Sequence, residues 1–429
     1  MRLRNQSIDV VGSAQFYNMA DAEERYAAVV VGAGSAGITA VGNLLERKIE
    51  PILWVDDAFV AGRVNTHYRE VMSNTQIWLI VAYAEALSVF RHILSGIPAE
   101  DIWAGRTEGK GGCDRLTCLR NMDQQEYCEL SYAADMLRIF SEELRKFPPV
   151  DSRAGWVTGA QLDENAPESD RWSVSVNEDG HSYHVKTQRL ILCQGAHPIC
   201  EPLPVHIPNI QPMDLDDALS HTNLTKLLGD AGPVTVGVIG ASHSAIIVLM
   251  HLHQIATKHN QDLRVRWFTR HDLRYAVQMD GWILRDTTGL KGIPAQFAKN
   301  NLEPDILAKS DVGKYLTRID YDKDEQEGTF DDRMPGCTYY VQAIGYTNNS
   351  HPELKTTSGK DITPYFNNSK ACFHYDEGCK GGEQTKIPGL YGLGIAWPER
   401  VRDPRGNEEL AVGFLKFMKF IKREIAGWS

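Results

Sequence analysis

The sequence predicts an α/β fold in which one strand–turn–helix–strand unit is inserted into a domain built around another. A buried-type strand runs into a glycine-containing turn near residue 32, and the same pattern returns near residue 240. A further strand that ends in glycine follows each unit. Each unit is therefore expected to begin its own Rossmann-like domain, a parallel sheet with helices on its faces.

The first unit has the order strand, glycine turn, helix, strand and acid, over residues 26–57. In its turn, Gly32 allows the tight bend, Gly34 lets the backbone approach a pyrophosphate, and Gly37 lets helix and strand pack closely. The helix N-terminus supplies amides and a positive dipole for phosphate. An acid after the second strand can accept hydrogen bonds from a ribose. The predicted dinucleotide-binding residues are Gly32, Gly34, Ser35, Ala36, Gly37 and Asp56 or Asp57; an ordinary structural turn is the alternative.

The second unit begins with the strand 233–239 and turns at Gly240-Ala241-Ser242-His243-Ser244-Ala245. A helix over 245–258 and a strand over 263–268 follow, and Arg270 stands where the first unit has its acids. A cation there can pair with a 2′-phosphate, which an acid would repel. The second unit is thus predicted to bind NADPH through Gly240, Ser242, Ser244 and Arg270. The alternative for Arg270 is a surface arginine at a strand end.

Three later strands end in glycine turns and set the order of the domains. Two look like equivalent crossover strands, which end at Gly195 and Gly345; the third carries Gly394 and Trp397 and precedes a closing helix predicted over 408–425, capped at Asn407. Gly413 would let that helix approach a ligand or a neighbouring helix. The predicted parts are a flexible tail (1–25), a first domain (26–205 and 385–429), an inserted NADPH domain (230–345), and an insertion or substrate-side segment (346–384).

Composition excludes several classes of protein. With 429 residues and 42% hydrophobic residues the chain is globular, and its longest apolar runs are too short for a membrane span. A net charge of −11 argues against nucleic-acid binding, since that requires a basic face. The eight cysteines are too sparse for a disulfide scaffold, which favours the cytoplasm, and no His/Cys cluster has metal-ligand spacing. A homo-oligomer is left open.

Two such units, each followed by a strand–glycine segment, resemble the two-dinucleotide flavoproteins over residues 26–429. This superfamily includes disulfide reductases and class B flavin monooxygenases, and the resemblance implies FAD in the first domain, with Arg63 after Gly62 near it. Ala343-Ile344-Gly345-Tyr346 is similar to an Ala-Thr-Gly-Tyr segment of N-hydroxylating monooxygenases, and the second turn resembles their NADPH turn. Their Phe-x-Gly-x3-His-x3-Trp/Tyr fingerprint is missing, which leaves the subfamily open.

The segment Ser73-Asn74-Thr75 resembles the place where flavin-containing monooxygenases keep an asparagine at the reactive edge of the flavin. The resemblance implies that Asn74 is the catalytic residue. It also implies that a C4a-peroxyflavin transfers one oxygen atom to a small amine or sulfur nucleophile. The alternative for this segment is a helix cap before the apolar run at Ile77.

A flavin reductase or oxidase, or a disulfide reductase acting on a thiol or quinone, is the alternative function. Cys113 and Cys118 have the spacing of a redox pair, but they follow Asp57 by more than fifty residues in a glycine-rich, charged stretch. We therefore interpret them as two reduced loop thiols.

Overall fold

The computed structural model describes residues 24–96, 115–375 and 385–428. Its first module is built on a seven-stranded sheet in the order β21-β22-β23-β10-β2-β3-β6. The strands are β2 (Ala28–Val31), β3 (Ile52–Asp56), β6 (Val150–Ala154), β10 (Leu190–Leu192), β21 (Tyr365–Asn367), β22 (Cys372–His374) and β23 (Lys386–Gly392). From β23 to β6 all neighbours are parallel, which confirms the parallel sheet predicted for the first unit.

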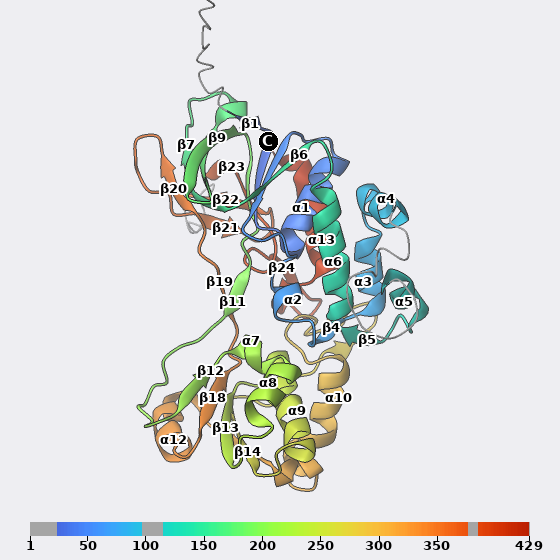
Figure 1. Cartoon of the computed structure of the whole chain (residues 1–429), viewed down its shortest axis with the longest axis vertical. Helices are drawn as coiled ribbons and strands as arrows, with labels where there is room; N and C mark the ends of the chain where they lie inside the picture. The colour runs from blue at the N-terminus through green and yellow to red at the C-terminus, as the bar shows by residue number, and fades with distance from the viewer. Residues whose placement is uncertain (1–23, 97–114, 376–384, 429) are drawn as a thin grey trace, which may run out of the picture.

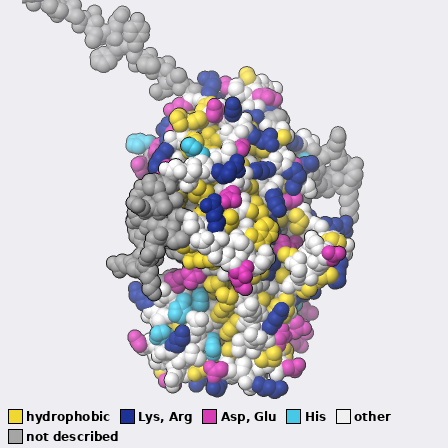
Figure 2. Space-filling view, turned by 90° about the vertical axis from the view of Figure 1, so that its right-hand side faces the viewer, with side chains coloured by type: hydrophobic (Ala, Val, Ile, Leu, Met, Phe, Trp, Pro, Cys, Tyr) yellow, Lys and Arg dark blue, Asp and Glu magenta, His cyan; other side chains and the backbone are white. Residues whose placement is uncertain are grey.

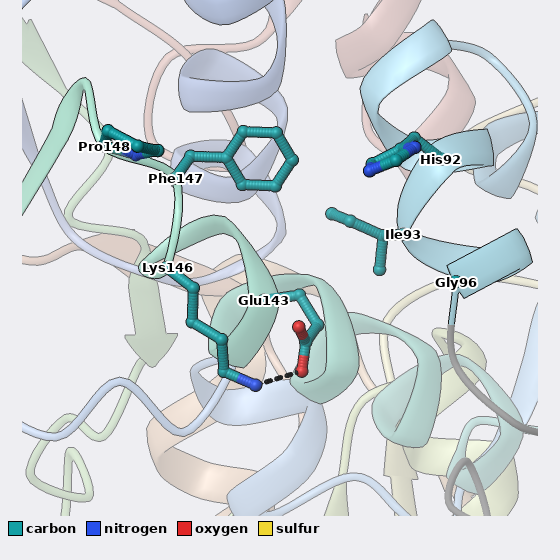
Figure 3. A pocket seen from close by; sticks show the side chains of 7 residues that line it. All are labelled: His92, Ile93, Gly96, Glu143, Lys146, Phe147 and Pro148. Atoms are coloured by element: carbon teal, nitrogen blue, oxygen red, sulfur yellow. Dashed lines mark hydrogen bonds and ion pairs between the residues drawn. The ribbon is translucent and has the colours of Figure 1, made fainter.

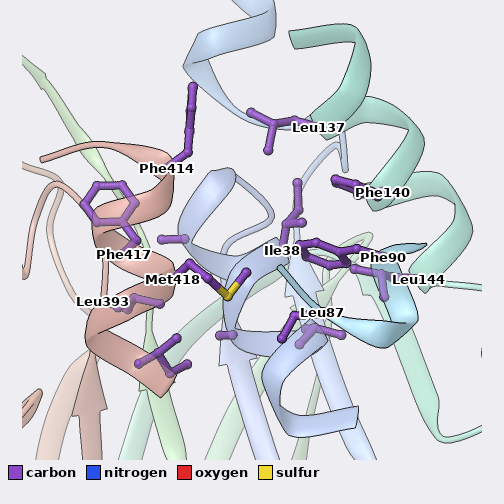
Figure 4. Packing of buried hydrophobic residues seen from close by; sticks show 14 of the residues in the cluster. Ile38, Leu87, Phe90, Leu137, Phe140, Leu144, Leu393, Phe414, Phe417 and Met418 are labelled. Carbon is purple, nitrogen blue, oxygen red and sulfur yellow. The ribbon is translucent and has the colours of Figure 1, made fainter. Parts of the chain in front are cut away.

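Helices cover one face of this sheet (Figure 1). They are α1 (Ser35–Glu46), α2 (Arg63–Thr66), α3 (Ile77–Ala84), α4 (Ser88–Gly96), α5 (Arg115–Asn121), α6 (Ser131–Leu144) and α13 (Phe414–Glu424). Figure 4 shows side chains of α1, α4, α6 and α13 meeting in one apolar cluster, in which the rings of Phe90 and Phe140 stack at 4.2 Å. This packing fixes α1, and with it the first glycine turn.

A second sheet covers the other face, in the order β1-β9-β8-β7-β20. Its three central strands are antiparallel, and its two edge strands pair in parallel. Its strands are β1 (Arg25–Tyr26), β7 (Trp156–Leu162), β8 (Trp172–Glu178), β9 (His181–Thr187) and β20 (Glu353–Thr356), and a short helix, η1 (Glu168–Asp170), precedes β8. Arg25 pairs with Lys186, so the predicted tail boundary at 25 was wrong by at least one residue. The remainder of that tail, 1–23, lies outside the described residues. Strands from the segment 346–384 join both sheets of this module.

The second module repeats the design with a parallel five-stranded sheet, β12-β18-β13-β14-β17. The strands are β12 (Gln211–Met213), β13 (Val234–Ile239), β14 (Leu263–Thr269), β17 (Leu316–Asp320) and β18 (Tyr339–Gln342). The helices are α7 (Leu215–Ala218), α8 (His221–Leu228), α9 (His243–Lys258), α10 (Gly292–Asn301), α11 (Pro304–Leu307), α12 (Gln326–Arg333), η2 (Asp311–Lys314) and η3 (Lys323–Glu325). β18 lies beside β13 as β10 lies beside β2, so the two crossover strands are equivalent, as predicted.

Two short strands connect the modules, β11 (Ala196–Pro198) and β19 (Tyr346–Asn348). They pair with each other in antiparallel register, and Figure 1 shows them as a two-stranded ribbon between the upper and lower modules. The chain enters the second module after β11 and leaves it at β19. The second module is therefore inserted into the first, in agreement with the predicted order.

The prediction of a closing helix from 408 was wrong in its first turns. Residues before α13 form a hairpin of β24 (Glu399–Arg402) and β25 (Glu408–Ala411). The carboxylate of Asp403 accepts hydrogen bonds from the backbone and side-chain amides of Asn407, so this asparagine serves the hairpin turn and caps no helix. The helix begins after Gly413, whose φ of 147° interrupts helical geometry. Other short elements are β4 (Met72–Gln76), β5 (Tyr127–Glu129), β15 (Val277–Gln278), β16 (Ile283–Leu284) and η4 (Ile425–Gly427).

Acidic, basic and apolar side chains are interspersed over the face shown in Figure 2. Within the described residues no single helix has the length and hydrophobicity to span a bilayer. The apolar helices α3 and α4 meet such a criterion only as a pair, and they are bent by 93° relative to each other.

A buried tryptophan holds the first glycine turn in each module. The indole Nε1 of Trp54 donates to the Gly32 carbonyl at 3.0 Å, and that of Trp267 donates to the Gly240 carbonyl at 2.7 Å. Both rings are fully buried and stand opposite equivalent positions of the neighbouring strand. The two turns therefore have the same support.

We predict that Trp54→Phe lowers the free energy of unfolding by about 1–3 kcal/mol, because the Gly32 carbonyl would lose its indole donor while the aromatic packing is largely kept. Urea denaturation of the purified protein measures this, with the exposed Trp156 changed to Phe as the control. Equal stability of the two variants would show that the indole hydrogen bond contributes nothing.

Candidate cofactor sites

The first turn is shaped to receive a ligand against its backbone. A Cβ added at Gly32 would lie 2.5 Å from the Cys193 carbonyl oxygen, and one added at Gly37 would lie 1.8 Å from the Gly32 oxygen, so both glycines are needed for close packing. A Cβ at Gly34 would meet only the Cα of Gly62, at 4.0 Å. The space in front of Gly34 is therefore open within the described residues, and it lies at the N-terminus of α1, whose first turn carries no acidic residue. These features fit a bound pyrophosphate.

Of the two acids at the end of β3, the structure brings Asp56 to the turn. Its carboxylate accepts hydrogen bonds from the Ala33 amide at 2.6 Å and from the Phe59 amide at 2.6 Å. Asp57 is largely exposed. The limited desolvation of its carboxyl group and the neighbouring Asp56 carboxylate raise its pKa. Asp56 thus braces the turn at the place where a ribose would lie; its contact with a ribose stays a prediction.

The second turn has the same shape at the start of α9. A Cβ at Gly240 would lie 2.4 Å from the Ala343 carbonyl oxygen, the Ser242 hydroxyl donates to that oxygen at 3.2 Å, and Ala245 is fully buried. Arg270 is exposed just beyond the end of β14. Arg270 thus follows directly after the strand that pairs with β13, which is the position that the NADPH prediction requires. Its contact with a 2′-phosphate stays a prediction.

Other predicted cofactor residues lie around the first turn. A Cβ at Gly394 would lie 2.6 Å from that of Ala36, so the segment after β23 packs against the first turn of α1. Trp397 packs edge-on against Phe373 at 4.8 Å and donates its indole N–H to Gln194 at 3.1 Å. Its ring therefore has a structural role in addition to any contact with a cofactor.

Three predicted residues lie at junctions between segments. Gly195 and Gly345 adopt φ of 74° and 126° at the ends of β10 and β18, where the chain passes into the ribbon of β11 and β19. Gly413 precedes α13 directly. Their conformations favour glycine, and their cofactor contacts stay predictions.

Arg63 joins the two modules. Its guanidinium donates to Asp216 on α7 and to the Tyr68 hydroxyl, which itself donates to Asp216 at 3.0 Å. Asp216 is buried, with 8% of its surface exposed. Its charge is compensated by Arg63 and the Tyr68 hydroxyl, as burial requires. Sequence patterns could not indicate Asp216, because it lies 153 residues from its arginine.

Asn74 lies in β4, and its side chain is exposed. The alternative interpretation of its segment as a helix cap was wrong, because α3 begins after Gln76 and no side chain caps it. The Ser73 hydroxyl instead accepts from the Thr75 amide at 2.8 Å. At the start of the same strand, the Met72 carbonyl is 3.0 Å from Nε2 of His243 in the second turn. β4 therefore lies beside the second turn, and it follows the segment that begins at Gly62 beside the first.

A separate pocket of about 340 Å³ lies between α4 and the end of α6 (Figure 3). Its lining residues are His92, Ile93, Gly96, Glu143, Lys146, Phe147 and Pro148. None of the predicted site residues lines it. Among the described residues no group of histidine, cysteine and acidic side chains has the arrangement of a metal site. Cys118 lies on α5, and Cys113 lies outside the described residues.

Comparison with known proteins shows the family. The chain is 43% identical to the monooxygenase AgnR1 of Paecilomyces divaricatus over 411 residues, which is 95% of this chain and 99% of that protein. The chain belongs to the family of this monooxygenase. No protein-family model matches it.

Solved structures agree in fold. Cyclohexanone monooxygenase from Rhodococcus sp. Phi1, bound to NADP+, superposes with a TM-score of 0.53 and 14% identity, over 94% of this chain and 83% of that one. The reduced ornithine hydroxylase PvdA of Pseudomonas aeruginosa gives a TM-score of 0.51 and 13% identity, over 94% and 98%. The predicted fold, with two Rossmann-like domains of which one is inserted into the other, is confirmed, and so is the prediction of a monooxygenase. FAD and NADPH as the cofactors of this chain stay predictions.

We predict that Gly34→Val folds but does not retain FAD. A valine side chain finds room in the protein at this position, and it fills the space that the pyrophosphate needs. FAD content after purification, measured from the absorbance spectrum, tests this. Gly328→Val on α12, where an added Cβ also meets nothing, is the control. Normal FAD content in the Gly34 variant would refute the first site.

We predict that Arg270→Ala raises the Michaelis constant for NADPH about tenfold to a hundredfold and changes that for NADH little, because one charge-assisted contact to the 2′-phosphate is lost. Steady-state kinetics with both cofactors test this. Arg264→Ala, near the opposite end of β14, serves as the control. Equal effects on the two cofactors would show that Arg270 does not bind the phosphate.

Proposed function

We propose that this enzyme transfers one oxygen atom from dioxygen to an amine or a sulfur atom of a small molecule, with NADPH as the reductant. The other oxygen atom leaves as water, and NADPH is oxidised to NADP+. We also propose a cytoplasmic location. The observation that carries the proposal is the position of β4: the exposed Asn74 lies on a strand that reaches from the segment beside the first turn to the second turn.

The residues of the two turns hold the cofactors in this proposal. FAD would bind against Gly34 and the N-terminus of α1, and NADPH against the N-terminus of α9, with Arg270 at its 2′-phosphate. When bound, the flavin supplies the redox chemistry that activates oxygen. The protein must then orient the two rings and exclude water.

Asn74 is proposed as the donor at the flavin edge. Its only described side-chain contact is a hydrogen bond that its amide oxygen accepts from the Thr75 hydroxyl at 3.3 Å. The amide NH2 therefore has no hydrogen-bond partner among the described residues and is available to a ligand. An oriented amide donor can stabilise negative charge that develops on an oxygen atom, provided that water is excluded.

The reaction is tested with ¹⁸O₂, NADPH and a panel of amines, sulfides, ketones and disulfides. We expect an amine or sulfide product that is heavier by one ¹⁸O atom, with no more than one such product for each NADPH consumed. A labelled ester from a ketone would overturn the proposed substrate class. Reduction of a disulfide without oxygen uptake would support the alternative, a disulfide reductase.

We predict that Asn74→Ala uncouples the reaction, with more hydrogen peroxide and less oxygenated product for each NADPH. Flavin reduction should stay nearly unchanged, because hydride transfer depends on how the two rings stack. Peroxide yield is measured beside the anaerobic rate of flavin reduction, and Asn65→Ala on α2 is the control. Unchanged coupling in a folded, flavin-loaded variant would remove Asn74 from the site.

A further inference from the structure

His243 bridges the second turn and the strand that carries Asn74. It is the first residue of α9, directly after the turn residue Ser242, and its Nε2 lies 3.0 Å from the Met72 carbonyl oxygen in β4. A carbonyl only accepts, so Nε2 carries the proton and Nδ1 carries a lone pair. That Nδ1 is buried and finds no hydrogen-bond partner among the described residues. Burial, together with the charge of Lys291, lowers the pKa of His243, so the imidazole is a neutral bridge near pH 7.

The conformation of β4 depends on its ends. β4 pairs with β5 at Met72 and at Gln76, and the ladder is irregular between these two positions. Asn74 lies in the irregular part, where the local contact between Ser73 and Thr75 replaces ladder pairing. Of the two paired positions, His243 contacts Met72. A shift of the imidazole would therefore be passed to Asn74 two residues away.

A second line of contacts leaves the same turn at the next residue. The Ser244 side chain lies near the Tyr346 phenol and acts to lower its pKa, and the Tyr346 ring meets that of Tyr68 edge-on at 6.5 Å. Tyr68 in turn donates to Asp216. Two consecutive residues of the second turn are thus linked to residues 63–76 of the first module, His243 directly and Ser244 through Tyr346.

We propose that His243 is a positioning residue that couples binding of the dinucleotide at the second turn to the geometry of the Asn74 strand. A pyrophosphate bound to the first turn of α9 orders the residue from which the imidazole projects, and this strengthens the contact with Met72. By thermodynamic linkage, loss of that contact weakens dinucleotide binding. The role assigned to Asn74 rests on the proposed function, but the coupling itself can be measured without turnover.

The test uses the oxidised, FAD-loaded enzyme with NADP+. Hydrogen–deuterium exchange of the peptide that covers residues 70–76 is measured with and without NADP+, and NADP+ affinity is measured by calorimetry. The variants are His243→Ala, which removes the donor, and His243→Gln, whose amide can still reach the carbonyl. His259→Ala at the exposed far end of α9 is the control.

In the wild type we expect NADP+ to slow exchange in this peptide. His243→Ala should abolish the slowing and weaken NADP+ binding about fivefold to tenfold, the effect of one hydrogen bond. His243→Gln should retain most of the slowed exchange and most of the NADP+ affinity. The control His259→Ala should behave like the wild type. Exchange in the wild type that does not respond to NADP+ would overturn the proposal, and so would Ala and Gln variants that behave alike. If His243→Ala does not load FAD, the proposal is tested by the exchange of the wild type with and without NADP+ and by the exchange and NADP+ affinity of His243→Gln.

Coupling through Asn74 has its own readout. If His243 acts through Asn74, the double variant with Asn74→Ala should release no more peroxide than Asn74→Ala alone. Additive peroxide yields would show that the two residues act independently. Failure to detect any oxygenated product would overturn the proposed function, yet it would leave the exchange and affinity results intact, so the two failures are distinguishable.

Discussion

In both modules the glycine turn before the first helix depends on an indole N–H donated to the first glycine carbonyl. This glycine also packs closely against the crossover strand. An added Cβ at Gly32 or Gly240 would lie within 2.5 Å of the carbonyl oxygen of the residue that directly follows that strand. Without Trp54 or Trp267 the glycine carbonyl would lose its indole donor, at a typical cost of about 1–3 kcal/mol. The first glycine of each turn is thus held in place by the protein itself, before any ligand binds.

The modules meet through polar contacts more than through a shared core. Val71 is the first-module residue that joins the buried cluster of the second module. Around it, Glu70 accepts hydrogen bonds from Ser220 and Thr222, and Asp216 accepts from Arg63. Such contacts are specific in direction but individually modest in energy. They can therefore set one relative orientation of the two sites and still respond to a bound ligand.

Local patterns in the sequence predicted the two turns, their strands and helices, and the order of the modules, because glycine spacing and apolar runs are local signals. The second sheet of the first module was missed, although Trp172, Val174 and Val176 alternate with more exposed residues along β8 in a readable period of two. Pairings such as Arg63 with Asp216 were beyond reach, because the folding of two separate modules decides them. The equivalent tryptophans were a signal that could have been used: each stands on the second strand of its unit, opposite the residue two before the first glycine.

The hairpin before α13, which sequence patterns did not predict, lies where the second module contacts the start of that helix. Glu409 on β25 accepts from the Thr287 and Thr288 amides of the second module. Next to them, Asp286 accepts from Lys416 in the first turn of α13, at 2.7 Å. The segment that precedes α10 is thus tied to the N-terminus of a first-module helix. Residues 286–291 also include Lys291, whose charge acts on His243. The start of α13 and the segment beside the second turn are therefore linked through the carboxylate of Asp286, which pairs with both Lys416 and Lys291.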